Sequence, residues 1–100
     1  MYYLYILYSS SADKFYVGYT NNYLRRFDEH NHSNHPTFTS KYRPWTLAAV
    51  YQCGQTESEA VQIEKFIKKQ KSRKLIEKLI NGTEINGILA QLVRVTHVRD

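Results

Sequence analysis

The sequence predicts a single α+β domain of 100 residues. Segments near residues 2–8, 14–19 and 46–52 are rich in the aromatic and β-branched residues that favour strands. Between and after them lie segments with the capping residues and apolar spacing of helices. The length suits one hydrophobic core, and a composition of 42% hydrophobic and 23% charged residues excludes a disordered chain.

The first two strands are expected to form a hairpin. Residues 2–8 have no polar break, which is typical of a strand covered on both faces. Alternation places Tyr5 on the face opposite to Leu4. After a polar connection of hairpin length, residues 14–19 return as the second strand and carry Tyr16.

A helix is expected from residue 23 to about residue 31, after the capping segment Thr-Asn-Asn. Its predicted buried stripe consists of Tyr23, Leu24 and Phe27. The polar, basic segment 37–44 is interpreted as a loop that leads into the third strand.

Two more helices follow the third strand. Thr56-Glu57-Ser58-Glu59 matches a capping box, in which a hydroxyl and a carboxylate satisfy backbone donors, and it predicts a helix from residue 57 to about 71. A second helix is expected over residues 72–80, ending at Asn81-Gly82.

The end of the chain has a weaker signal. Residues 92–98 have the β-branched content of a strand. We therefore expect a core over residues 1–80 and, over residues 81–100, an extension of the same domain in which an added strand is one option.

The net charge of +5 is unevenly distributed. The excess lies within residues 41–80, and residues 65–78 alone predict a compact basic face that suits a polyanion. A solvated helix face is the alternative interpretation. The side chains expected to contact nucleic acid are Lys41, Arg43, Lys68, Lys69 and Lys71.

The expected compartment is the cytoplasm. Cys53 is the single cysteine, which suits a reducing environment and excludes a disulfide framework. No apolar run approaches the roughly 20 residues of a membrane helix, so we expect no membrane segment.

Glu64 is anomalous on a helical wheel. Ala60, Ile63 and Ile67 define the apolar face of its helix, and Glu64 falls inside that face. A carboxylate directed toward a core needs a partner, so Glu64 is expected to bind a metal, meet a buried cation or line a cleft. The alternative is an ion pair with Lys68, four residues later.

Arg26 and His30 are four residues apart and therefore share one face of the first helix. A guanidinium offers a bidentate fork for a phosphate, and an imidazole can transfer a proton. Two unrelated surface residues are the alternative interpretation.

Tyr3-Leu4-Tyr5 and Tyr16-Val17-Gly18 resemble the two signature elements of the GIY-YIG nuclease superfamily, and Arg26, His30 and Glu64 follow at matching positions. The resemblance covers about residues 1–80. The chain is similar to a small stand-alone bacterial branch of that superfamily, related to the cleavage domain of the excision-repair nuclease. The segment Ser40-Lys41-Tyr42-Arg43-Pro44-Trp45 also resembles that branch.

The resemblance implies a three-stranded antiparallel sheet flanked by helices, and hydrolysis of a DNA phosphodiester with one divalent metal, Mg²⁺ or Mn²⁺. It assigns the metal to Glu64, the scissile phosphate to Arg26, placement and generation of the attacking hydroxide to Tyr5 and Tyr16, and proton transfer to His30. A tyrosine beside a cation is expected to have a lowered pKa, as a base requires.

We therefore expect a metal-dependent DNA endonuclease that acts in DNA repair or processing, with DNA as its partner and its oligomeric state left open. One alternative is a nucleic-acid binding module that kept the fold without the chemistry. Another is a protein-interaction domain that assembles through its C-terminal strand.

Overall fold

A computed structural model of the chain describes residues 1–34, 36–82 and 87–96. Its centre is an antiparallel sheet with the strand order β2-β1-β3-β4. The strands are β1 (Tyr2–Ser9), β2 (Lys14–Thr20), β3 (Thr46–Gly54) and β4 (Val93–Arg94). The three strands predicted from the sequence are confirmed as antiparallel, but the sheet has a fourth.

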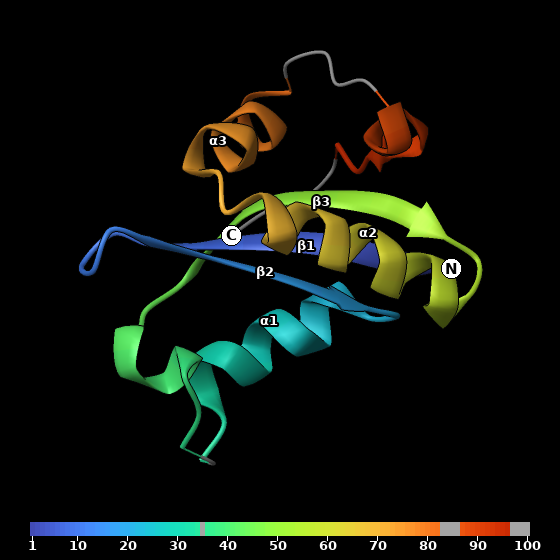
Figure 1. Cartoon of the computed structure of the whole chain (residues 1–100). Helices are drawn as coiled ribbons and strands as arrows, with labels where there is room; N and C mark the ends of the chain where they lie inside the picture. Colours follow the sequence, from blue (N-terminus) through green and yellow to red (C-terminus); the bar gives the residue numbers. More distant parts are fainter. Residues whose placement is uncertain (35, 83–86, 97–100) are drawn as a thin grey trace.

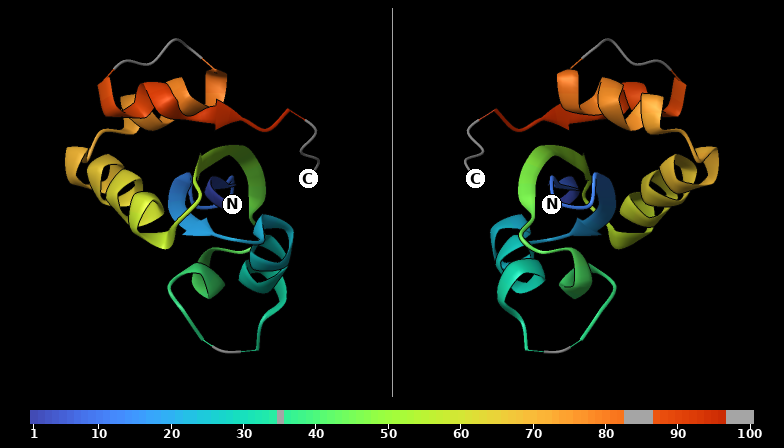
Figure 2. Two further views of the ribbon diagram at one scale, coloured as in Figure 1. Left: turned by 90° about the vertical axis from the view of Figure 1, so that its right-hand side faces the viewer. Right: turned by 90° about the vertical axis from the view of Figure 1, so that its left-hand side faces the viewer.

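Helices cover both faces of the sheet (Figures 1 and 2). The helix α1 (Tyr23–His32) lies on one face, and α2 (Glu57–Gln70) and α3 (Arg73–Asn81) lie on the other. Strand alternation explains this arrangement. Leu4 and Ile6 of β1 pack toward α2, whereas Tyr5 and Leu7 pack toward α1.

The predicted capping box is confirmed at the start of α2. The backbone N–H of Glu59 donates to the Thr56 hydroxyl at 3.3 Å, and the Glu59 carboxylate accepts from the backbone N–H of Thr56 at 3.1 Å. Lys71, with φ of 49°, ends the helix in the left-handed region and turns the chain into α3.

The predicted buried stripe of α1 is wrong at one position. Leu24 is 59% exposed, whereas Tyr23, Phe27 and His30 face the sheet. These three residues follow the i, i+4, i+7 spacing of one helical face. His30 is tolerated on this buried face because both of its ring nitrogens are hydrogen-bonded, as described below.

The segment 37–44 is also more ordered than a plain loop. It contains a 3₁₀ helix, η1 (Thr39–Tyr42), which packs beside α1. The indole N–H of the buried Trp45 donates to the backbone carbonyl of Thr39 at 2.7 Å and anchors this turn.

The C-terminal segment joins the same sheet. After a second 3₁₀ helix, η2 (Gly87–Gln91), Val93 and Arg94 pair with β3 as β4, and the backbone N–H of Val95 donates to the Val50 carbonyl at 2.9 Å. The strand predicted over residues 92–98 is therefore shorter in the described part, and its last two positions lie outside the described residues. Within that part, no helix combines the length and apolar character needed to cross a membrane.

Candidate functional site

Tyr5, Tyr16 and His30 form an aromatic cluster on the α1 side of the sheet. The ring centroids of Tyr5 and Tyr16 lie 6.2 Å apart, and the His30 ring is 5.7 Å from Tyr5 and 4.9 Å from Tyr16. The Tyr5 hydroxyl is hydrogen-bonded to His30 Nε2 at 2.8 Å. The expectation that the two tyrosines share one face of the hairpin is thus confirmed.

Gly18 makes room for this cluster. It lies opposite Tyr5 in the β1–β2 register, so the phenol ring crosses its backbone. A Cβ at Gly18 would stand 2.5 Å from the Tyr5 hydroxyl oxygen and 2.6 Å from Cζ. Any side chain there would therefore displace Tyr5 from His30.

His30 is held on its other side by η1. Its Nδ1 is hydrogen-bonded to the Thr39 hydroxyl at 2.8 Å, and Thr39 contacts the Thr37 hydroxyl at 3.1 Å. His30 is 4% exposed and Thr39 is 3% exposed. Sequence reasoning missed Thr39, because a buried hydroxyl in a short 3₁₀ turn leaves no periodic signal.

Burial controls the protonation of this cluster. It lowers the pKa of His30 to about 4, and the positive charges of Arg26 and Arg43 act in the same direction, while Glu29 opposes them. Burial is also the main cause that raises the pKa of Tyr5, and the neighbouring Tyr16 raises it further. The expected lowering is therefore not found for Tyr5, which is a neutral phenol in the protein alone.

Arg26 projects from α1 beside the cluster. Its guanidinium donates to Glu29 at 3.0 Å, its positive charge opposes the rise in the pKa of Tyr5, and its side chain is 41% exposed. Together with Tyr16 and His30 it lines a small cavity of about 100 Å³. The structure thus brings the predicted phosphate ligand next to the predicted proton carriers.

Glu64 lies on α2, which contacts β2 on the face of the sheet opposite to α1. Its side chain is 18% exposed, and Oε1 is 3.5 Å from Nζ of Lys68. The same Lys68 ammonium stands 5.4 Å from the centre of the Tyr16 ring. The wheel correctly placed Glu64 beside the buried residues of α2, and the alternative ion pair with Lys68 is also present.

A larger, basic cavity of about 570 Å³ adjoins the cluster. It shares Tyr16 and the 54% exposed Phe38 with the small cavity. Its cationic side chains are Lys14, Lys68, Lys71 and Arg73. Arg73 is paired with Asp13 at 2.6 Å, a closer ion pair than that of Lys68 with Glu64 at 3.5 Å.

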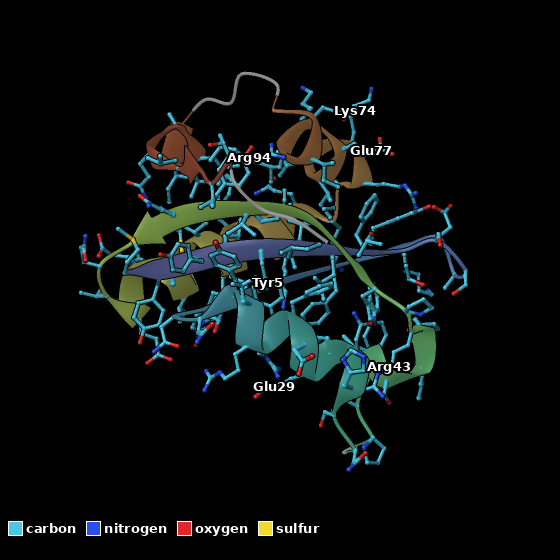
Figure 3. All side chains as sticks on the ribbon, turned by 180° about the vertical axis from the view of Figure 1, so that it is seen from behind. Tyr5, Glu29, Arg43, Lys74, Glu77 and Arg94 are labelled. Atoms are coloured by element: carbon cyan, nitrogen blue, oxygen red, sulfur yellow. The ribbon has the colours of Figure 1, made fainter. Side chains whose placement is uncertain are left out.

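The other predicted DNA contacts are placed differently. Lys69 and Lys41 are exposed and do not line this cavity. Arg43 instead caps the end of α1 (Figure 3): its Nε donates to the His30 carbonyl at 2.6 Å, and its Nη2 donates to the Ser33 carbonyl at 2.8 Å. Because these donors are used inside the protein, we leave Arg43 out of the DNA-binding set.

The residues present fit one weakly held divalent cation. Among the described residues, no three His, Cys, Asp or Glu side chains gather as a metal-binding group. Mg²⁺, however, is commonly bound by one or two carboxylates, with water and substrate phosphates filling the remaining positions. Glu64 supplies one such carboxylate next to a basic cavity.

Comparison with known protein families gives one finding. Residues 1–78 match the family model described as the GIY-YIG catalytic domain. A search of curated proteins found no match to the chain.

Proposed function

The chain belongs to the GIY-YIG family of nuclease domains, and from this membership we propose that it is a metal-dependent DNA endonuclease that acts in DNA repair or processing. The carrying observation is that Tyr16, Arg26 and His30 line one small cavity, while Glu64 is paired with Lys68, which lines the adjoining basic cavity. We also propose that it belongs to the small stand-alone branch related to the excision-repair nuclease.

Substrate binding begins with phosphate contacts. Lys14, Lys68 and Lys71 line the larger cavity and attract the DNA backbone, which gives affinity with little sequence preference. Arg26, at the adjoining small cavity, then binds the scissile phosphate through its planar fork. Glu29 holds that fork in place before the DNA arrives.

Proton transfer is assigned to the aromatic cluster. Tyr16 lines both cavities, so its hydroxyl can orient the attacking water. His30 is neutral at pH 7 because its pKa is about 4, and a neutral imidazole can accept a proton. His30 lines the small cavity and its Nε2 is bonded to the Tyr5 hydroxyl, so we assign proton transfer to this pair.

Glu64 would hold Mg²⁺ or Mn²⁺. The cation would supply positive charge next to the leaving oxygen and lower the pKa of bound water. Lys68 is a neighbour of Glu64 in the protein alone and shifts to a DNA phosphate when the cavity fills.

The test uses nicked, branched and linear DNA with and without Mg²⁺. Cleavage is expected only with the metal, and Glu64→Gln should abolish it while DNA binding persists, because the charge that holds a hard cation is removed. Glu77→Gln, the same change at an exposed position of α3, is the matched control. Arg26→Ala should lower the rate about 10²- to 10³-fold.

The alternative is a DNA-binding module without chemistry. The Lys68–Glu64 ion pair favours it, because it already neutralises the one carboxylate assigned to a metal. DNA binding in the presence of a chelator, with no cleavage of any substrate in Mg²⁺ or Mn²⁺, would establish this alternative and exclude the endonuclease.

A further inference from the structure

A chain of hydrogen bonds runs from the centre of the sheet to the surface through η1. It links the Tyr5 hydroxyl, both ring nitrogens of His30, and the hydroxyls of Thr39 and Thr37. The first three residues are at most 4% exposed, whereas Thr37 is exposed. The function proposed above uses Tyr5 and His30 but gives no role to the hydroxyl of Thr39.

The direction of these bonds follows from what each group can donate. Tyr5 is 1% exposed, so its phenolic proton needs an acceptor inside the protein. The group hydrogen-bonded to the Tyr5 hydroxyl is Nε2 of His30, which therefore accepts that proton. A neutral imidazole carries one proton, which must then be on Nδ1. Nδ1–H in turn donates to Thr39.

We propose that Thr39 is a positioning residue: its hydroxyl keeps the proton of His30 on Nδ1, so that Nε2 accepts from Tyr5 and stays the basic nitrogen of the cluster. The inference rests on the proposed function only for the statement that His30 takes part in proton transfer. Thr39 lies nine residues from His30 in the chain and on a different element.

The same arrangement explains why the hydroxyl is needed. Without it, Nδ1–H would be a buried donor with no acceptor, which is unfavourable. The ring would then favour the other tautomer, with the proton on Nε2. Nε2–H would then donate to the Tyr5 oxygen. His30 would no longer offer Tyr5 a nitrogen that can accept a proton.

The experiment reads the tautomer directly by long-range ¹H–¹⁵N NMR of the histidine rings at pH 7. In the wild type, His30 is expected to be protonated on Nδ1, and Thr39→Val should shift it toward the Nε2–H form. Thr39→Ser, which restores a hydroxyl, should restore the wild-type tautomer. Thr46→Val removes a hydroxyl from the exposed start of β3 and is the matched control.

Cleavage of nicked DNA gives the second readout. Thr39→Val should lower kcat about 10- to 100-fold with little change in KM, because Nε2 of His30 no longer accepts a proton, and Thr39→Ser should recover most of the rate. A wild-type His30 protonated on Nε2, or a tautomer unchanged in Thr39→Val, overturns the inference even if the protein cleaves DNA. If the protein cleaves nothing, the NMR result still decides the role of Thr39.

Discussion

Acidification from pH 7.5 to pH 5 is expected to destabilise the fold through His30. This ring is 4% exposed, and Arg26 and Arg43 add positive charge to its surroundings, with Glu29 as the opposing carboxylate. Burial therefore lowers the pKa of His30 to about 4 from an ordinary value of 6.5. The unfolded chain accepts the proton more readily than the folded one, so stability is complete above pH 6.5 and is lost as the pH falls toward 4.

The magnitude follows from the two pKa values. Their full difference corresponds to roughly 3 kcal/mol, reached only below pH 4. At pH 5 the linkage relation gives a loss of about 2 kcal/mol. Asp13 and Glu59 have lowered pKa values because of hydrogen bonds to their carboxylates, so their contributions disappear only at more acidic pH. These two carboxylates therefore contribute little to the change between pH 7 and pH 5.

Urea unfolding at a series of pH values provides the assay, with the fluorescence of the single, buried Trp45 as the signal. His30→Gln should flatten the dependence between pH 7 and pH 5, whatever its effect on absolute stability. His32→Gln, at an exposed position of the same helix, should leave the dependence as in the wild type. A wild-type curve without the loss, or the same loss in His30→Gln, would refute the reasoning.

Three further outcomes are expected. Gly18→Ala should cost about 1–3 kcal/mol in urea unfolding, because the new Cβ meets the Tyr5 hydroxyl at 2.5 Å; an unchanged midpoint would contradict this. Lys68→Met should reduce the slope of log DNA affinity against log salt by about one, whereas the exposed Lys65→Met should change it less; equal slopes would mean that the cavity does not bind DNA. Arg43→Met should lower the free energy of unfolding by about 1–3 kcal/mol, because carbonyls at the end of α1 lose their donors, and should leave the salt slope unchanged.

Patterns among neighbouring residues were sufficient to predict most of the strands and helices. Alternation in the first strand predicted that Tyr5 faces away from Leu4, and hairpin length predicted that this strand pairs with the second one. The capping box predicted the start of α2 within one residue. Helical spacing predicted that Glu64 lies inside the buried face of its helix, and its side chain is 18% exposed, because this property depends mainly on neighbours three and four residues away.

Contacts between distant segments were not predictable in this way. The burial of His30 depends on Thr39 and Tyr5, which come from other elements, so periodicity favoured Leu24 for the buried stripe instead. Arg43 was predicted to bind DNA from its charge alone, but it caps α1 in the fold. The raised pKa of Tyr5 results from its burial, which no local pattern of charges reveals.

The two-residue strand β4 also affects whether the strand of another chain could pair with β3. Unpaired backbone groups along an outermost strand are a template for strand addition and aggregation, and short, charged outer strands suppress it. β4 covers Tyr51 and Gln52 of β3 and places Arg94 outside them, where its guanidinium donates to the Leu79 carbonyl at 2.9 Å (Figure 3). A chain without Val93 and Arg94 would expose that part of β3, so β4 shields backbone groups with which another strand could pair, on the border away from the candidate site.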